Sequence, residues 1–256
     1  MTRYFMQLAY RGAPFHGWQS QPNAVSVQST IERALSLIYR QPVPIVGAGR
    51  TDTGVNASMM LAHFDAPLAV EDKPALLRSI NSIVGKDIAV SHIHDVPQDA
   101  HARFDATSRT YHYHAITSKS PFLYTTAWNA SPALDFDLMN EAGKMLLDVE
   151  DFTSFAKLHS DAKTNICHVT QARWERIGDD RWCFVITADR FLRNMVRAVV
   201  GTLVDVGRHK LDVEGFRRVI ETRDRCAAGT SMPAQALFLN NITYPYLPVL
   251  IPAAEP

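Results

Sequence analysis

Two hydrophobic periodicities alternate along the first hundred residues. In residues 4–10 every second side chain is large and apolar or aromatic, which is typical of a strand. The next apolar residues recur at helical spacing, after a Ser26 that can cap the helix and before a Pro42 that ends it. The predicted order is strand, helix, strand, strand, helix and strand, over residues 4–10, 27–41, 43–48, 58–64, 74–84 and 88–93.

The second half of the chain shows a related pattern. The expected elements are a strand, a helix, two strands, two helices and a closing strand, over residues 108–117, 137–147, 168–177, 182–188, 190–206, 213–221 and 236–244. No residue-level repeat links the two halves, so their similarity is one of element order.

The first half follows the β-α-β-β-α-β order of the split βαβ unit, and the second half follows a similar order with one additional helix. The sequence therefore predicts an α+β fold built from two ferredoxin-like (βαββαβ) halves with an active-site cleft between them. We expect one domain over residues 1–105 and a second over 106–256. A chain of 256 residues, 46% of them apolar, is long enough to give each half a core.

Composition narrows the class of protein. No apolar run approaches the roughly 18 residues of a membrane span, and the first residues lack the apolar core and cleavage site of a secretory signal. The three cysteines are far apart and form no CxxC pair, which disfavours a disulfide framework. We therefore expect the protein to be located in the reducing cytoplasm. A formal net charge of +0 argues against non-specific coating of nucleic acid, but it allows an RNA enzyme with its basic residues in one cleft.

The segment Gly47–Ala57 holds the most informative chemistry. Its three glycines allow tight turns and close approach of a ligand. Arg50 and Asp52 are two residues apart, and a neighbouring arginine lowers a carboxylate pKa, which suits a nucleophile or base. An ordinary turn in which Arg50 only forms a salt bridge with Asp52 is the plainer alternative.

Asp52-Thr53-Gly54 also matches the tripeptide of aspartic proteases. Those enzymes need two carboxylates that share a proton. The tripeptide occurs once in this chain, so a dimer would have to supply the second carboxylate, and Arg50 would oppose proton sharing. The pattern therefore disfavours a protease.

Gly47–Ala57 resembles the GAGRTDxGVHA signature of TruA-type tRNA pseudouridine synthases. Further landmarks of that family occur in the family's order across nearly the whole chain: Phe15–Gln19, His101–Phe104, Arg109–Tyr113, Asp151–Phe155, Phe191–Arg197 and Val200–Leu203. The chain departs from the family pattern at Asn56, where the family usually has His, and at Ala236, where a Gly-Leu pair usually begins. These two departures bear on RNA contacts and local backbone rather than on the reaction.

The resemblance implies an isomerase that converts uridine to pseudouridine in the anticodon stem-loop of tRNA, at tRNA positions 38–40. It implies a homodimer that binds tRNA in the cytoplasm and uses no cofactor. An RNA-binding protein with a defunct site is the alternative from a different class of protein. The set Arg50, Asp52, Tyr111 and Arg197 argues against that alternative because all four family site residues are present.

The resemblance also assigns roles to residues. Asp52 is the catalytic carboxylate, Arg50 occupies the space that a flipped base leaves, and Tyr111 stacks on the uracil. Arg197 pairs with the catalytic carboxylate, and Leu237 lines the base pocket. From pattern alone, Tyr111 and Leu237 would be ordinary core residues.

Other basic residues are candidates for phosphate contacts. Helix 190–206 is expected to carry Arg190 and Arg193 on the same face as Arg197. Arg103 and Arg109 are further candidates, although surface charge would also explain them.

Two alternate-residue histidine pairs suggest a metal. These are His92 with His94 and His112 with His114. Because no carboxylate or cysteine lies at a supporting spacing, the sequence predicts no metal site.

Overall fold

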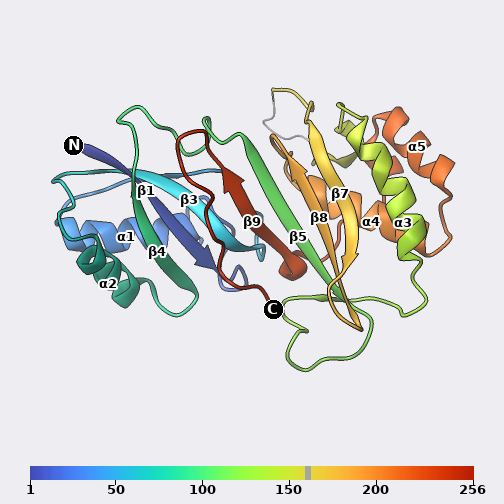
Figure 1. Ribbon diagram of the computed structural model, residues 1–256, viewed down its shortest axis with the longest axis horizontal. Helices are drawn as coiled ribbons and strands as arrows, with labels where there is room; N and C mark the ends of the chain where they lie inside the picture. Colours follow the sequence, from blue (N-terminus) through green and yellow to red (C-terminus); the bar gives the residue numbers. More distant parts are fainter. Residues whose placement is uncertain (159–162) are drawn as a thin grey trace. The chain divides into compact units, whose positions relative to one another are not determined.

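The computed structural model describes residues 1–158 and 163–256, and the chain divides into two compact units. The first unit contains Met1–Thr107 and Leu239–Glu255, and the second contains Ser108–Phe238 together with Pro256. Both units combine strands with helices (Figure 1), which confirms the α+β class. In the described part of the chain, no helix is long and apolar enough to cross a membrane.

The first unit has the element order that the sequence predicts. It contains β1 (Thr2–Tyr10), α1 (Val27–Tyr39), β2 (Ile45–Gly47), β3 (Asn56–Ala66), α2 (Lys73–Val84) and β4 (Ile88–Asp95). β1 pairs antiparallel with β3 and with β4, and β2 pairs antiparallel with β3. Since Phe64 pairs with Tyr4 of β1 and with Ile45 of β2, those two strands flank β3, and the order is β4-β1-β3-β2. This is the ferredoxin-like arrangement.

β1 is buried on both faces, whereas a strand with one solvated face would alternate. Phe5 is as buried as Met6. The ring of Phe5 meets Tyr244 at 5.2 Å, and the Gln7 side-chain amide donates to the carbonyl of Ile251 at 2.8 Å. The C-terminal segment of the first unit therefore covers the face of β1 that the sequence pattern left unassigned.

Local capping fixes both helices of this unit. Ser26 accepts a hydrogen bond from the Ser29 N–H at 3.1 Å, and Ser29 bonds back to complete a capping box. Asp72 accepts from the Ala75 N–H at 2.8 Å, with Pro74 in the first turn of α2. These side chains satisfy N–H groups that have no partner inside the helix.

The second unit is built around an antiparallel sheet. It contains β5 (Ser108–Ile116), β6 (Trp128–Asn129), α3 (Phe136–Lys144), β7 (Val169–Arg176), β8 (Arg181–Ala188), α4 (Met195–Gly207) and α5 (Val213–Thr222). β8 pairs antiparallel with β5 on one side and β7 on the other. β9 (Leu237–Thr243) begins in this unit and ends in the first.

α4 is the central helix of the second unit and is buried almost all round. At Gly201 a Cβ atom would lie 1.9 Å from the carbonyl oxygen of Thr230, so only glycine allows this approach. The start of α4 corrects a prediction. The expected helix began near Arg190, but Asn194 has a left-handed φ of 66°, and the helix begins at Met195. Arg190 and Arg193 therefore precede the helix and do not share a helical face with Arg197.

Candidate functional site

Asp52 lies in the loop between β2 and β3 of the first unit. It is half-buried, whereas its neighbour Thr51 is buried. The carbonyl of Asp52 accepts a hydrogen bond from the Val55 N–H at 3.1 Å, and Gly54 has a φ of 80° in the same turn. Asp52 thus lies in a closed turn of backbone.

Two segments hold this turn in place. The hydroxyls of Tyr10 and Thr51 are 2.8 Å apart, and the Trp18 N–H donates to the carbonyl of Thr51 at 3.2 Å. A Cβ at Gly17, whose φ is 84°, would lie 2.4 Å from the same carbonyl oxygen of Thr51. The loop is therefore fixed by direct packing of backbone on backbone. The sequence pattern did not predict a role for Tyr10, Gly17 or Trp18, although the last two lie in a family landmark.

Asn56 explains one departure from the family pattern. Its side chain is buried, and its oxygen accepts a hydrogen bond from the Gly12 N–H at 2.8 Å. Asn56 thereby ties the loop after β1 to the start of β3. Asn56 therefore supports the local backbone.

Arg50 is exposed. Among the described residues its side chain has no hydrogen-bond or ion-pair partner, so the simple salt bridge to Asp52 is not formed. The guanidinium is available to a ligand.

Tyr111 lies on β5 of the second unit and is half-buried. Its ring meets Phe191 edge to face, with the centroids 5.0 Å apart. Tyr113, two residues further on the same face of the strand, is fully buried. Among the described residues, the Tyr113 hydroxyl has no hydrogen-bond partner. Burial raises the pKa of Tyr113 far above its ordinary value, and the charge of Arg197 opposes that shift.

Arg197 occupies the first turn of α4 and is half-buried. Its Nε donates to the carbonyl of Met232 at 2.5 Å, and its own carbonyl accepts from the Met232 N–H at 3.1 Å. Two contacts with one residue fix both the backbone and the side chain of Arg197. In the second unit, Tyr111 therefore lies against Phe191, which precedes α4, and Arg197 lies in the first turn of that helix.

The remaining predicted residues differ in their surroundings. Leu237 is buried at the start of β9. Arg109 is half-buried and donates through Nη1 to the carbonyl of Asp189 at 2.7 Å, which gives it a structural contact. Arg103 and Arg193 are both exposed.

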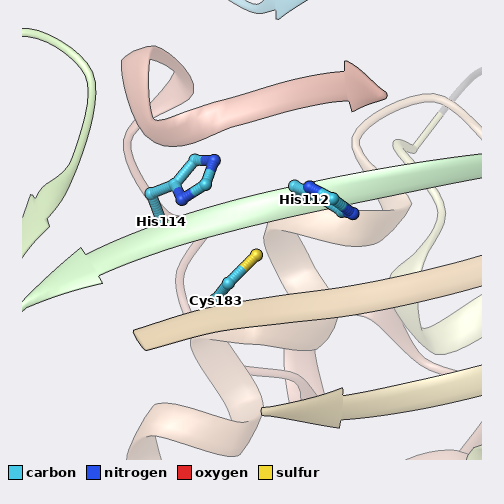
Figure 2. Close-up of side chains that lie close together, drawn as sticks. All are labelled: His112, His114 and Cys183. Atoms are coloured by element: carbon cyan, nitrogen blue, oxygen red, sulfur yellow. The ribbon is translucent and has the colours of Figure 1, made fainter. Parts of the chain in front are cut away.

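One cluster of metal-type ligands occurs among the described residues, and Figure 2 shows it: His112, His114 and Cys183. His114 on β5 pairs directly with Cys183 on β8, so strand register supplies the cysteine that sequence spacing did not show. The ligand atoms lie within 4.8 Å of one another, whereas ligands of one zinc ion are about 3.5 Å apart. These three residues could hold a soft divalent ion only if their ligand atoms moved about 1 Å closer together. The structure thus removes the reason for which the sequence argued against a metal here.

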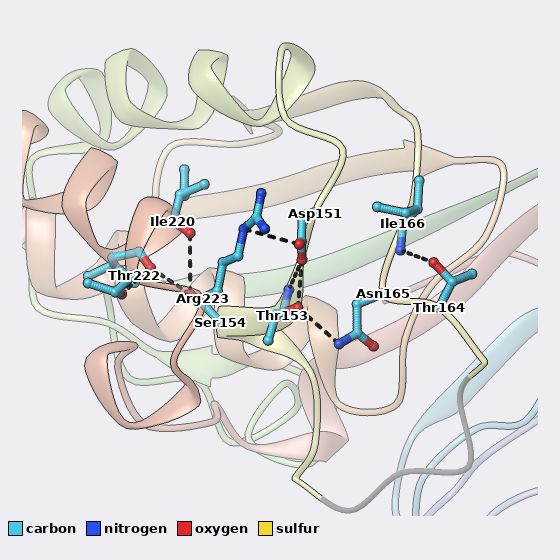
Figure 3. A network of polar contacts seen from close by, with 10 residues as sticks. Asp151, Thr153, Ser154, Thr164, Asn165, Ile166, Ile220, Thr222 and Arg223 are labelled. Carbon is cyan, nitrogen blue, oxygen red and sulfur yellow. Dashed lines mark hydrogen bonds and ion pairs between the residues drawn. The ribbon is translucent and has the colours of Figure 1, made fainter.

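The Asp151–Phe155 landmark has a structural role (Figure 3). Asp151 accepts hydrogen bonds from the N–H and hydroxyl of Thr153 at 3.0 and 2.6 Å, and Arg223 lies 3.2 Å from its other oxygen. Burial tends to raise the pKa of Asp151, but these bonds and the arginine outweigh it, and the pKa is lowered. The Ser154 hydroxyl donates to the carbonyl of Val219 at 2.6 Å. The network anchors this turn to the end of α5.

Comparison with known proteins places the chain in a family. Residues 142–245 match a family model described as tRNA pseudouridine synthase. The tRNA pseudouridine synthase A of Parabacteroides distasonis is 56% identical over 96% of this chain and 97% of its own length. The enzyme of the same name from Bacteroides thetaiotaomicron is 54% identical over 96% of this chain and 91% of its own length. The one from Thermotoga petrophila is 37% identical over 95% of this chain and 100% of its own length. The chain belongs to the tRNA pseudouridine synthase A family.

Membership in this family confirms the resemblance that the motifs carried. The segment matched by the family model contains Arg193, Arg197 and Leu237. Asp52 and Tyr111 lie outside that segment, and for these residues the similarity rests on the near-complete coverage by the relatives. The sequence and both compact units therefore point to one enzyme class.

Proposed function

We propose that this protein isomerises uridine to pseudouridine in tRNA. The substrate region is the anticodon stem-loop, at tRNA positions 38–40, and the reaction uses no cofactor. Relatives over 50% identical across almost the whole chain are named tRNA pseudouridine synthase A. Neither a protease nor an RNA-binding protein without turnover has comparable support.

One structural observation carries the proposal: Asp52 is a half-buried carboxylate on a turn whose backbone is fixed by neighbouring segments. A group that reacts with a ribose must be held within a fraction of an ångström of its target. Fixing the backbone through Thr51 achieves this without engaging the carboxylate itself in those contacts.

The reaction is balanced without an external reactant. The bond between N1 of uracil and C1′ of the ribose breaks, and the freed base turns. A new bond forms between C5 and the same C1′, C5 loses a proton, and N1 gains one. Asp52 assists the first cleavage, either by adding to C1′ or by promoting elimination to a glycal.

The uridine must leave the base stack before this bond can be reached. We assign Arg50 to the space that the base vacates. Its guanidinium is exposed and has no partner among the described residues, which supports this assignment. Tyr111 stacks on the flipped uracil, and Leu237 contributes to the base pocket. The edge-to-face contact with Phe191 would hold the Tyr111 ring ready for stacking.

The arginines have separate roles in the proposal. Arg197 supplies positive charge during bond cleavage. Its contacts with Met232 fix its orientation, so the charge is held in place. Exposed Arg103 and Arg193 contact phosphates and set the affinity for tRNA. Arg109 contributes to substrate binding through the backbone that it supports at Asp189.

The proposal also covers assembly and place of action. We infer a homodimer that binds tRNA in the cytoplasm, as the family resemblance implies. Light scattering of the purified protein at micromolar concentration tests the dimer. A single mass near 28.6 kDa would contradict it.

Release of tritium from tRNA labelled at C5 of uridine tests the function directly. Each isomerisation frees one C5 hydrogen, so release should equal the amount of pseudouridine found by mass spectrometry at positions 38–40. An RNA-binding protein without a working site would bind the tRNA but release no tritium. That result would refute the proposed function.

A further inference from the structure

The loop between β4 and β5 contains a run of backbone N–H groups that all donate hydrogen bonds. Each of the six consecutive N–H groups of residues 100–105 donates a hydrogen bond. The Ala100 N–H donates to the carbonyl of Pro97, the Asp105 N–H donates to that of His101, and the other four donate to side chains. Exposed loops usually leave such groups to water. The backbone of residues 100–105 is therefore held by hydrogen bonds within the protein.

His101 is the internal support of the loop. Its Nδ1 accepts hydrogen bonds from the N–H groups of Arg103 and Phe104 at 3.1 and 3.2 Å. Its own N–H donates to Asp105 at 2.7 Å. Because Nδ1 accepts two bonds, it carries no proton, and the imidazole proton is on Nε2.

The rest of the first unit supports the loop from beneath. Nδ1 of buried His63 accepts from the Ala102 N–H at 3.1 Å. Burial, with the charge of Arg3, lowers the pKa of His63 to about 4, so this acceptor stays neutral near pH 7. The hydroxyls of Tyr244 and Tyr246 donate to the carbonyl of Ala102 and to Asp105.

This rigid loop holds an aromatic ring in solvent. The side chain of Phe104 is 74% exposed. The His101 ring is stacked on it with centroids 4.3 Å apart, and the guanidinium of Arg103 is 5.6 Å from its centroid. A single exposed apolar side chain needs no explanation. Here the backbone, a stacked imidazole and a cation all define the position of the ring.

We propose that Phe104 is a base-stacking residue that binds an unpaired nucleobase of the tRNA, with Arg103 contacting the adjoining phosphate. The inference rests on the proposed function for the identity of the RNA. A pre-oriented aromatic ring beside a cation matches the two chemical parts of a nucleotide, a flat base and an anionic phosphate. Because the ring is already ordered, binding loses little conformational entropy. Phe104 is a binding residue and takes no part in bond cleavage.

Phe104→Ala and Phe104→Trp test this inference together. We expect the alanine variant to raise the Kd for tRNA and the KM by about tenfold, with kcat within about twofold of wild type. The tryptophan variant should restore Kd and KM because it keeps a stacking face. Both variants should keep the wild-type Tm, since the ring is exposed. Phe122→Ala is the matched control. Phe122 is 87% exposed, and in the part of the chain that the structure describes its N–H donates one long hydrogen bond, to Ser120 at 3.3 Å.

Three results would overturn the inference. One is an unchanged Kd in Phe104→Ala. The second is an equal loss of affinity in Phe122→Ala, which would mean that any exposed aromatic contributes. The third is a change of Phe104→Ala to a smaller assembly in light scattering, which would make the ring a contact between copies of the chain. Absence of pseudouridine from the wild-type reaction would refute the proposed function instead, and the binding comparison would still decide the role of Phe104.

Discussion

The loop that carries Asp52 and the start of α4 that carries Arg197 position their charges in different ways. At Asp52 the supporting hydrogen bonds go to the backbone and to Thr51. At Arg197 the guanidinium itself is bonded to the carbonyl of Met232. The first arrangement fixes the backbone that carries the carboxylate proposed to react. The second fixes a group whose charge alone is used. These contacts support our proposal that the first unit supplies the nucleophile or base and the second supplies positive charge.

The largest effect is expected for Asp52→Asn. The amide keeps the shape of the side chain but cannot act as a carboxylate, so turnover should fall by about a thousandfold or more. The Kd for tRNA should stay within about threefold, because phosphate contacts dominate affinity. Tritium release and filter binding measure the two quantities. Turnover within tenfold of wild type would remove Asp52 from the mechanism.

Arg197→Ala should have the next largest effect, with kcat lowered about a hundredfold as for loss of one charge-stabilising donor. Arg193→Ala is the matched variant, because Arg193 is exposed and lies outside the helix. It should raise KM and leave kcat almost unchanged. Steady-state kinetics of both variants separate the two roles. Equal small effects would contradict the contrast between a half-buried arginine and an exposed one.

Gly17→Ala should lower activity by about tenfold through displacement of the Asp52 loop. The new methyl group would meet the carbonyl of Thr51 at 2.4 Å, and φ is 84°. Gly49→Ala is the control in the same region, because its Cβ would meet nothing within 4 Å. We expect a lower Tm for Gly17→Ala only, and the fall in kcat of that variant should accompany its lower Tm. Wild-type kinetics in Gly17→Ala would show that the packing of backbone on backbone does not position Asp52.

The smallest effect is expected at the His112, His114 and Cys183 cluster. The isomerisation needs no metal, so dialysis against a chelator and Cys183→Ser should each leave kcat within about twofold. Cys226→Ser, at an exposed cysteine, controls for general loss of a thiol. Activity that falls with chelator and returns with zinc would show that the second unit contributes more than the charge of Arg197.

The predicted and observed elements agree where local signals act alone. Ser26 and Asp72 cap helices through their own side chains, and alternation in the sequence predicts the strand that forms β5. The candidate site was also readable in part, because Arg50 and Asp52 lie in one short segment. The helix start at Met195 was not readable, since the left-handed backbone of Asn194 interrupts a continuous apolar pattern.

The sequence by itself determined the order of elements, the α+β class and the family motifs, because capping, turn chemistry and hydrophobic period act over a few residues. Tertiary structure alone decided which distant groups meet. It placed Tyr244 against Phe5, Asn56 on the backbone of Gly12, and Cys183 opposite His114. Strand register and the return of the C-terminal segment set these contacts. The hydrophobic period of each segment does not show which distant residues these two features bring together.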